Sequence, residues 1–408
     1  MTGVVTLADV RAAGDRIAGR VLRSPCPRSI PLSELVGADV FCKLDLLQRT
    51  GSFKERGAAN ALLQLDAAAR ARGVVAASAG NHALGLSYHG RLLGIPVTVV
   101  MPRFAPLVKV STCRRLGARV ILEGETFDDA RRVAGEIAAR DGLDRIHGFD
   151  DPRVIAGQGT MGLEILDDLP DIDAIVVPTG GAGLLAGVGV AVKSLRPEIR
   201  LVAVETAAAP SFSASLAAGR PVAVPIRPTL ADGLAVGRVG DLPFALAAPL
   251  VDRVVTVDEA EVSLAVLRLL ELEKTVVEGA AATALAAVLG DRCPELAGQR
   301  IVLLLCGGNI DLTILDRVID HGLVADGRRW RFIARISDRP GGIARLTAAI
   351  AQAGASVREV VHDRAFSGAD VFSTAVEVTV ETAGHEHVAA LAAALAAEGF
   401  EVRPATTV

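Results

Sequence analysis

The sequence is poor in several features that mark particular classes of protein. Only 3% of its 408 residues are aromatic, and its five cysteines are scattered, with no C-x-x-C pair. An odd, scattered set of thiols does not form a disulfide framework, and neither the cysteines nor the seven histidines have the spacing of a zinc site. We therefore expect no disulfide-stabilised scaffold and no structural metal.

Long apolar runs and an excess of one charge are also missing. No apolar stretch reaches the roughly 20 residues that a bilayer span needs, and the N-terminus lacks the order of residues typical of a secretion signal. The 43 basic and 47 acidic residues are interspersed and give a net charge of −4. No basic surface for nucleic acid or for a membrane is predicted. We expect a cytoplasmic protein whose partner is a small molecule.

The chain is rich in alanine, valine, leucine and glycine, and 51% of its residues are hydrophobic. This composition is typical of a buried parallel sheet covered by alanine-rich helices. After a helix at 6–20 and an extended run at 40–46, helical and strand-like patterns alternate, which favours βαβ crossovers. The alternating elements are helices at 54–70, 81–94, 106–116 and 126–140, and strands at 74–77, 96–101 and 118–122.

A second series of strands predicts a second α/β lobe that shares one cleft with the first. Its strands are expected near 173–178, 199–204, 254–257 and 301–305. After Arg328 the pattern becomes strand, helix, two strands, helix and strand, the order of a ferredoxin-like unit. These last elements are predicted at 331–337, 341–352, 356–363, 370–380, 385–397 and 399–403.

One short stretch, Thr-Gly-Ser-Phe-Lys-Glu-Arg-Gly-Ala at residues 50–58, places a lysine where a lysine is unfavourable. Ser52 is a candidate cap for a helix whose first turn carries Lys54. Unpaired amide hydrogens at a helix start disfavour an ammonium and favour the neutral amine, which can form an imine with a carbonyl. The simpler alternative is a solvated lysine.

Two turns that follow predicted strands are candidate binding sites. The turn at 78–82 either holds a carboxylate or simply caps a helix; its residues are Ser78, Ala79, Gly80, Asn81 and His82. The turn at 180–184 can surround a phosphate with backbone amides. With Glu205 at the end of the next strand, it also matches a dinucleotide fingerprint, and its glycines could serve turn geometry alone. Its residues are Gly180, Gly181, Ala182, Gly183 and Leu184.

Three later segments complete the set: T-L-A-D-G at 229–233, V-V-E-G-A at 276–280 and L-C-G-G-N at 305–309. Together with the S-F-K-x-R-G stretch, the S-A-G-N-H turn and the glycine turn, they resemble the tryptophan synthase β-like (fold type II) family of pyridoxal-phosphate enzymes. Within that family they are most similar to the threonine and serine dehydratases. The resemblance covers about 320 residues through separate motifs in the expected order. It implies a two-lobed parallel-sheet catalytic domain at 1–325, with a smaller lobe at roughly 45–150.

The resemblance implies roles for individual residues. Lys54 holds pyridoxal 5′-phosphate covalently and removes the substrate's α-proton, and Asn81 donates to the cofactor's phenolic oxygen. The 180–184 turn binds the phosphate, where Ala182 replaces a glycine and is tolerated if the position needs no positive φ. Further implied contacts are the substrate carboxylate in the 78–82 turn, the close backbone of Gly233, and Cys306 beside the pyridine nitrogen.

Four further positions bear on the site or on its reaction. Relatives that racemise serine use a second serine where this chain has Ala79, so elimination is favoured. A neutral Cys306 cannot keep the pyridine nitrogen protonated, which favours rapid loss of a β-substituent over transamination. Glu278 is either a helix cap or a group near the ring. Some relatives bind a cation at the position of Glu205, but Ser211 replaces an expected carboxylate, so we predict no metal.

The implied function is deamination of L-threonine to 2-oxobutanoate and ammonia, and of L-serine to pyruvate. Alternatives are serine racemisation, hydroxyaspartate elimination, sulfur-based β-replacement, and a non-catalytic amino-acid sensor. Residues 329–408 resemble an ACT domain, with the turn Asp338-Arg339-Pro340-Gly341-Gly342 ahead of its first helix. That resemblance implies an isoleucine or valine effector and a homo-oligomer, a dimer or tetramer. The alternative is a unit that only dimerises.

Overall fold

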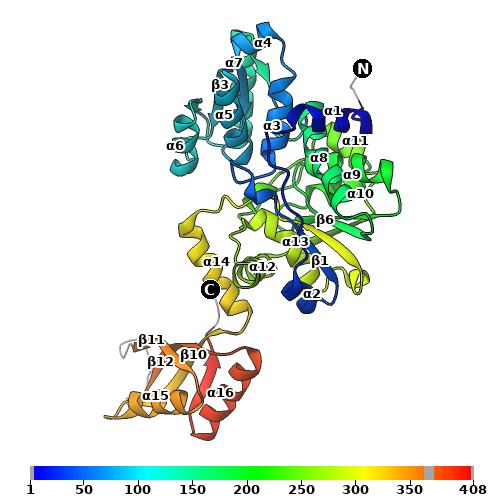
Figure 1. Cartoon of the computed structure of the whole chain (residues 1–408). Helices are drawn as coiled ribbons and strands as arrows, with labels where there is room; N and C mark the ends of the chain where they lie inside the picture. Colours follow the sequence, from blue (N-terminus) through cyan, green and yellow to red (C-terminus); the bar gives the residue numbers. More distant parts are fainter. Residues whose placement is uncertain (1–3, 363–371, 406–408) are drawn as a thin grey trace. The chain divides into compact units, whose positions relative to one another are not determined.

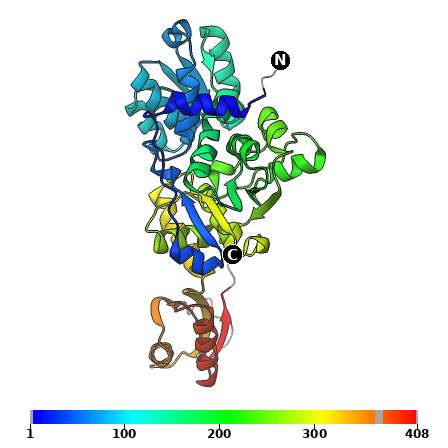
Figure 2. The same ribbon diagram turned by 45° about the vertical axis from the view of Figure 1, so that its right-hand side comes forward.

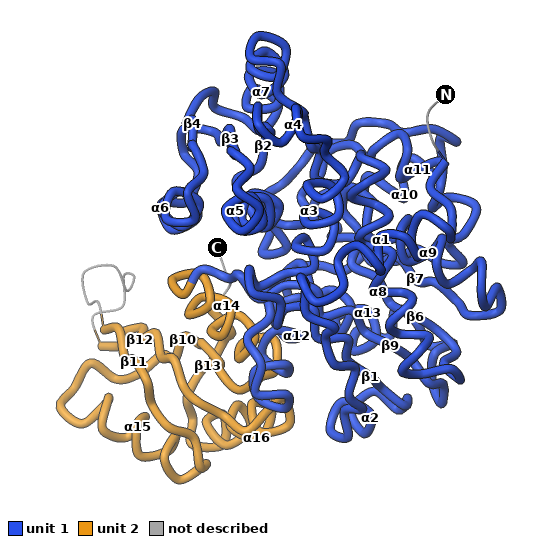
Figure 3. The backbone as a smooth tube through the Cα atoms, turned by 45° about the horizontal axis from the view of Figure 1, so that its top comes forward, with its two compact units in different colours: residues 1–311 blue, residues 312–408 orange. Residues whose placement is uncertain are grey.

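The computed structural model describes residues 4–362 and 372–405. It divides the chain into two compact units, residues 1–311 and residues 312–408 (Figure 3). The first unit contains two parallel sheets and the second one antiparallel sheet, so the predicted fold class is confirmed. Helix α14 (Leu312–Ala325), which was predicted to lie in the larger part, belongs to the second unit.

The smaller parallel sheet has the strand order β4-β3-β2-β5. Figure 1 shows α5, α6 and α7 gathered around it in one lobe. All five residues of β3 are buried and four are valine or methionine, as expected for a sheet covered on both faces. The strands of this sheet are β2 (Val74–Ala77), β3 (Val97–Met101), β4 (Arg119–Leu122) and β5 (Asp144–Arg145). The helices are α3 (Lys54–Leu63), α4 (Ala67–Arg72), α5 (Asn81–Leu93), α6 (Leu107–Arg115) and α7 (Phe127–Asp141).

One helix predicted for this lobe, at 54–70, is two helices. The chain leaves α3 at Gln64, and Asp66 then caps α4 by accepting a hydrogen bond from the amide of Ala69 at 2.7 Å. An aspartate favours an N-cap over a helix interior because its side chain competes for backbone amides. Strand β5 has only two residues, too few for an alternating pattern to predict it.

The larger parallel sheet has the order β1-β9-β6-β7-β8. Its first strand comes from far earlier in the chain than its neighbour, since Lys43 is registered with Leu304. The strands are β1 (Asp39–Lys43), β6 (Ala174–Pro178), β7 (Arg200–Thr206), β8 (Arg253–Val257) and β9 (Arg300–Leu304). The helices of this lobe are α1 (Leu7–Ile17), α2 (Ile30–Val36), α8 (Pro152–Asp168), α9 (Gly183–Leu195), α10 (Ser211–Ala218), α11 (Asp241–Ala247), α12 (Glu259–Leu272) and α13 (Gly279–Leu289). Short 3₁₀ helices are η1 (Asp45–Leu47), η2 (Asp232–Leu234) and η3 (Pro294–Leu296).

The two lobes of this unit are joined by packing between α3 and α8, and α8 in turn packs against α9. A Cβ at Gly157 would lie 2.7 Å from the Cα of Gly57, so this glycine pair lets α8 and α3 approach closely. In Figure 2, α1 (dark blue) crosses the junction of the lobes, and it contacts both α3 and α8.

A buried ion network fixes the same junction. Arg56 of α3 is completely buried and donates to Asp45 at 2.7 Å and to Glu164 of α8 at 2.6 Å. Lys43 is also completely buried and donates to Glu164 at 2.7 Å and to the carbonyl of Ser24 at 2.6 Å. Burial by itself would raise the pKa of Asp45, but the adjoining Arg56 guanidinium outweighs it and lowers that pKa overall. The ion network therefore anchors α3 at Arg56, two residues after Lys54.

The second unit has the antiparallel strand order β11-β12-β10-β13. Two helices and four strands follow one another in the predicted ferredoxin-like order, after α14. Residues 363, 370 and 371 of the predicted strands lie outside the described residues. The elements are β10 (Arg329–Ser337), α15 (Gly342–Gln352), β11 (Ser356–His362), β12 (Ser373–Glu381), α16 (His385–Ala397) and β13 (Glu401–Pro404). Across residues 4–362 and 372–405, no helix combines the length and the apolarity needed to cross a membrane.

Candidate active site

Lys54 is the first residue of α3, as predicted, but the cap differs from the prediction. The N-cap residue is Phe53, with no side-chain cap bond. The expected capping by Ser52 is wrong, because Ser52 pairs through its backbone with Gly307 and its buried Oγ has no hydrogen-bond partner among the described residues. Lys54 is partly buried, and its Nζ donates to the carbonyl of Gly148 at 2.7 Å. It is therefore not the freely solvated lysine of the simpler reading.

The segment before Lys54 is hydrogen-bonded to the L-C-G-G-N segment. The amide of Phe53 donates to the carbonyl of Cys306 at 2.9 Å, and the amide of Gly308 donates to the carbonyl of Gly51 at 2.9 Å. Gly51 has a φ of 76°, and a Cβ there would overlap the side chain of Asn309. These bonds bring Lys54 and Cys306 together although more than half of the chain separates them.

The 78–82 turn lies between β2 and α5, with Gly80 as the N-cap and no side-chain cap bond. Asn81 donates through Nδ2 to both carboxylate oxygens of Glu278, at 2.9 and 3.1 Å. Its Oδ1 accepts a hydrogen bond from Nδ2 of Asn309 at 2.9 Å. Ser78 accepts from the amide of Gly80 at 3.3 Å. The turn is thus tied to the segments around Glu278 and Cys306 rather than used only as a helix cap.

Two residues of this turn pack against the smaller lobe. Ala79 packs against its hydrophobic core. His82 is 4% exposed, and burial lowers the pKa of its imidazole to about 3. Its Nε2 lies 3.2 Å from the carbonyl oxygen of Ile146, and a Cβ at Gly148 would lie 3.3 Å from its ring. His82 therefore supports the segment whose carbonyl holds Lys54.

The 180–184 turn connects β6 to α9 and packs against Phe149. A Cβ at Gly183 would lie 2.8 Å from the carbonyl oxygen of Phe149, and a Cβ at Gly181 would overlap its ring. Because Gly148 binds Lys54 and Phe149 contacts the turn, the predicted phosphate site and the predicted cofactor lysine meet at one segment. Leu184 follows in the first turn of α9 and is 5% exposed.

Ala182 has φ 65° and ψ 4°, the left-handed conformation. The methyl group was expected to be tolerated if this position needed no positive φ. Because the observed φ is positive, that condition is not met. A non-glycine residue in this region costs roughly 1–2 kcal/mol because Cβ approaches the following carbonyl.

The T-L-A-D-G and V-V-E-G-A segments close the remaining side of the site. A Cβ at Gly233 would lie 3.0 Å from the Cβ of Ala280 and 3.8 Å from Oε1 of Glu278. Gly180 is adjacent to the same loop, since a Cβ there would lie 3.0 Å from the Cα of Leu234. All the predicted segments are thus brought together, and Glu278 lies inside the site. Glu278 is also the N-cap residue of α13, which begins at Gly279, but its side chain makes no cap bond.

Glu205 lies outside this arrangement. Its carboxylate accepts hydrogen bonds from the amides of Phe212 and Ser213, the latter at 2.9 Å, so it serves the start of α10. These contacts support neither a role of Glu205 in binding a dinucleotide nor a role in binding a cation. In the described part of the chain, no group of three or more His, Cys, Asp or Glu side chains is placed to hold a metal ion.

The electrostatics of the site make the Lys54 ammonium easier to deprotonate than an ordinary lysine. Burial lowers the pKa of Lys54 to about 8, against the opposing effect of the Glu278 carboxylate. Burial raises the pKa of Glu278 to about 7, against its hydrogen bonds from Asn81. Burial and then the nearby Glu278 raise the pKa of the Cys306 thiol, which is 4% exposed and stays neutral. A nucleophilic amine beside a neutral thiol suits imine chemistry.

Three residues of the site, Gly148, Phe149 and Asn309, were given no role from the sequence. Gly148 and Phe149 follow a two-residue strand, which is too short for an alternating pattern to reveal the turn after it. Asn309 stood in a quoted motif, but its partners Thr50 and Asn81 are 259 and 228 residues away.

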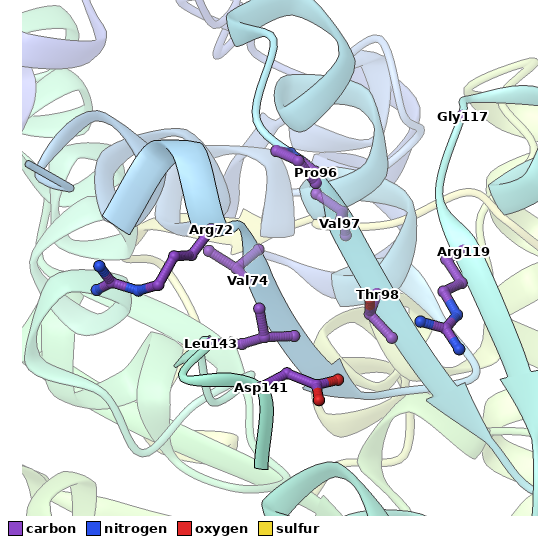
Figure 4. Close-up of a pocket in the computed structure, with 9 residues that line it drawn as sticks. All are labelled: Arg72, Val74, Pro96, Val97, Thr98, Gly117, Arg119, Asp141 and Leu143. Atoms are coloured by element: carbon purple, nitrogen blue, oxygen red, sulfur yellow. The ribbon is translucent and has the colours of Figure 1, made fainter. Parts of the chain in front are cut away.

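Cavities elsewhere in the first unit are not part of this site. One of about 410 Å³ opens where β2, β3 and β4 begin, at the amino ends of these parallel strands (Figure 4). Ligands of open α/β sheets bind outside the carboxyl ends of the strands, the edge from which the 78–82 turn emerges. The cavity is lined by Arg72, Val74, Pro96, Val97, Thr98, Gly117, Arg119, Asp141 and Leu143.

The residues of the site fit pyridoxal 5′-phosphate. Lys54 supplies an amine of lowered pKa, and the turn at 180–183 is a cradle whose glycines have no room for a Cβ where Phe149 packs. The buried Oγ of Ser52, two residues before Lys54, is unpartnered within the described residues and is free to bind a polar group.

Comparison with known proteins agrees with this fit. Residues 17–307 match the family model described as pyridoxal-phosphate dependent enzyme, and the chain belongs to this family. The chain is 45% identical over 400 residues to the L-threonine ammonia-lyase of Thermotoga maritima, covering 98% of this chain and 99% of that protein. The family resemblance and the cofactor are confirmed.

Solved structures show the same catalytic fold. The processed form of threonine deaminase isoform 2 from Solanum lycopersicum is 36% identical, with a TM-score of 0.73 and coverage of 77% of this chain and 92% of that one. Maize serine racemase is 34% identical, with a TM-score of 0.74 and coverage of 79% and 99%. Because a deaminase and a racemase match about equally well, the fold alone does not select the reaction.

Proposed function

We propose that this chain is an L-threonine ammonia-lyase that converts L-threonine to 2-oxobutanoate and ammonia, and L-serine to pyruvate. The observation that carries the proposal is the identity of 45% with a relative of that name across 98% of the chain. The arrangement around Lys54 supports it, since the amine lies 2.7 Å from the carbonyl of Gly148 within a site formed by all the segments typical of the family.

Each group of the site has a proposed task. When bound, pyridoxal phosphate supplies an aldehyde for attachment of amines and a ring that delocalises negative charge from the substrate's α-carbon. Lys54 would hold the cofactor covalently, and its free Nζ would remove the α-proton of the bound substrate. Asn81 would donate to the phenolic oxygen, the amides of the 180–184 turn would bind the phosphate, and a neutral Cys306 beside the pyridine nitrogen would leave that nitrogen unprotonated.

The 78–82 turn is proposed to bind the substrate carboxylate through backbone amides at the start of α5 and through Ser78 and Asn81. Ala79 decides between elimination and racemisation. A racemase needs acid-base groups on both faces of the α-carbon, and the methyl of Ala79 cannot exchange a proton. Loss of the β-hydroxyl is therefore favoured over return of the proton to the opposite face.

Two measurements test the assignment. The purified protein should absorb near the edge of the visible range, and borohydride should fix the cofactor to a peptide containing Lys54. Keto-acid release from L-threonine should exceed release from L-serine and from 3-hydroxyaspartate. A protein that binds an amino acid without any cofactor absorbance would instead be a sensor, and faster release from 3-hydroxyaspartate would reassign the substrate.

We further propose that residues 329–408 form an ACT-type regulatory domain that binds isoleucine or valine and pairs with the same domain of another copy. The antiparallel order β11-β12-β10-β13 supports this proposal. So does the turn ahead of α15, where Gly341 has a φ of 95° and a Cβ at Gly342 would overlap the carbonyl of Ser337. Backbone that only glycine accommodates easily at a helix start is suited to close approach of a ligand.

Deletion of residues 329–408 tests the regulatory role. The truncated enzyme should retain basal turnover of threonine but lose its response to isoleucine and valine. If the response persists, the effector site lies elsewhere. If the intact enzyme forms a dimer or tetramer but shows no response, the second unit serves assembly alone. The cytoplasmic location expected from the sequence stays a prediction.

A further inference from the structure

The side-chain amide of Asn81 is held from two sides by groups distant in sequence. On one side the carboxylate of Glu278 accepts from its Nδ2 at 2.9 and 3.1 Å. On the other side Nδ2 of Asn309 donates to its Oδ1 at 2.9 Å. Asn309 is itself fixed, because its Nδ2 also donates to the carbonyl of Thr50 at 2.7 Å.

This chain of bonds permits only one orientation of each amide. A backbone carbonyl can only accept, so Asn309 must turn its NH₂ group toward Thr50, and its second N–H then meets Asn81. An ionised carboxylate can also only accept, so Asn81 must turn its NH₂ group toward Glu278. A flip of Asn81 would set its oxygen against the carboxylate of Glu278 and its NH₂ group against that of Asn309. Both contacts would become repulsive.

We propose that Glu278 and Asn309 are positioning residues that fix the orientation of the Asn81 amide and so direct its remaining N–H toward the cofactor. Asn81 Nδ2 carries two hydrogens, and the Glu278 carboxylate needs only one of them. The other is available for the phenolic oxygen of pyridoxal phosphate. The inference depends on the proposed contact between Asn81 and the cofactor, and it is independent of which amino acid is the substrate.

The surroundings of Glu278 keep its carboxylate in place. It is 7% exposed, and its amide donates to the carbonyl of Gly307 at 3.0 Å. A Cβ at Gly307 would overlap the Glu278 carboxylate, so a glycine there is required by the position of this side chain. The packing therefore leaves the carboxylate on the Asn81 side.

The charge of Glu278 depends on pH. The nearby charge of Asp232 raises the pKa of Glu278, and that of Lys109 lowers it. The Glu278 carboxylate in turn raises the pKa values of Lys54 and Cys306. Because burial raises its pKa to about 7, binding experiments belong at pH 8 or above, where the acceptor form dominates.

The test uses four variants and two readouts. The variants are Asn81→Ala, Glu278→Ala, Glu278→Gln and Asn309→Asp. For each, the dissociation constant of pyridoxal phosphate is measured by absorbance titration of the cofactor-free protein at pH 8.5, and the midpoint of the pH dependence of the bound-cofactor spectrum is recorded. Thermal unfolding of the cofactor-free form reports effects on stability alone. The control variant is Glu205→Gln, which removes a buried carboxylate elsewhere in the same lobe.

The expected pattern follows from which variants keep the Asn81 orientation. Asn81→Ala, Glu278→Ala and Asn309→Asp should each raise the dissociation constant about tenfold, the effect of losing one hydrogen bond. They should also shift the spectral midpoint in the same direction. Glu278→Gln retains an acceptor oxygen, so its dissociation constant should stay within about threefold of the parent value. Glu205→Gln should change neither readout.

Other patterns would overturn the inference. If Asn81→Ala weakens binding but Glu278→Ala and Asn309→Asp only lower the unfolding temperature, the pair has a structural role alone. If Glu278→Gln is as harmful as Glu278→Ala, the charge matters and the orientation does not. If Asn81→Ala leaves both readouts unchanged, the proposed Asn81 contact itself fails, and the inference fails with it. Because Glu278→Gln and Asn309→Asp preserve side-chain size, at least one informative variant is expected to fold.

Discussion

Lys54 is predicted to make the stability of the cofactor-free protein depend on pH between 7 and 10. The unfolded chain holds its lysine proton up to the ordinary pKa of 10.5, whereas burial lowers the pKa of folded Lys54 to about 8. Between these values the unfolded state binds more protons than the folded state, so stability rises with pH. Replacement of Lys54 by methionine, which fills a similar volume without a charge, should remove this rise.

The magnitude follows from the two pKa values. At 1.36 kcal/mol per pH unit, a lowering from 10.5 to about 8 corresponds to roughly 3 kcal/mol. Lys54 is only partly buried, so its charge keeps some hydration, and about 2 kcal/mol is a realistic expectation. At pH 7 the charged amine destabilises the folded parent. The free energy of unfolding of Lys54→Met minus that of the parent should therefore be larger at pH 7 than at pH 10.

The assay is urea unfolding of cofactor-free parent and Lys54→Met protein at intervals from pH 7 to pH 10. The difference in the free energy of unfolding between the two proteins should change by about 2 kcal/mol over this range. The control is Lys274→Met, which removes an exposed lysine and should give a nearly constant difference. A constant difference for Lys54→Met as well would show that its amine is solvated and charged, and burial would then not account for a nucleophilic lysine.

Three further predictions concern the packing around the site. Gly181→Ala forces the ring of Phe149 to move and should raise the dissociation constant of pyridoxal phosphate about 5- to 150-fold in an absorbance titration, which corresponds to about 1–3 kcal/mol of overpacking. Ala182→Gly should change the free energy of unfolding by less than about 1 kcal/mol, because relief of a left-handed alanine is offset by a lost buried methyl and a more flexible chain, whereas Ala182→Val should cost more than about 2 kcal/mol. Asp45→Asn should cost about 3 kcal/mol at pH 7 in urea unfolding, since it removes the buried partner of Arg56. Because the folded pKa of Asp45 is lowered, this advantage of the parent should shrink as the pH falls below about 4.

Much of the fold could be predicted from the sequence because its elements carry strong local patterns. The strand at 74–77 was placed with the observed bounds, and helix 385–397 likewise, since apolar periodicity and flanking turns agree at both. The prediction of a single helix at 54–70 was wrong at Asp66. The helical periodicity of the sequence continues through this residue, although it caps a new helix. The pairing of β1 with β9 was not predicted, because a parallel pair between distant strands leaves no local trace in either one.

The candidate site divides in the same way. Lys54, Asn81 and the 180–184 turn could be named because each lies in a short stretch whose backbone geometry demands particular residues. The positive φ of Ala182 could not be predicted, since an alanine gives no indication of a left-handed backbone. The bond from Lys54 to Gly148 and the bonds that orient Asn81 join segments 94, 197 and 228 residues apart. Such contacts are set by tertiary structure, which no local pattern encodes.

Helix α3 brings two basic side chains, Lys54 and Arg56, close together in opposite surroundings, and the contrast explains how the site stays reactive. Arg56 has ionised partners on both sides, Asp45 and Glu164, within 2.8 Å. Lys54, two residues earlier, contacts a neutral carbonyl and the ring of Phe53 rather than a carboxylate, and Ser52 before it has a buried hydroxyl without a partner among the described residues. A paired cation resists displacement, whereas an unpaired amine and an unsatisfied hydroxyl are destabilising until a ligand contacts them. The paired network therefore fixes the helix so that the unpaired groups keep their places without cofactor. Binding of pyridoxal phosphate should then stabilise the fold, by about 2.7 kcal/mol at a free concentration about a hundred times its dissociation constant.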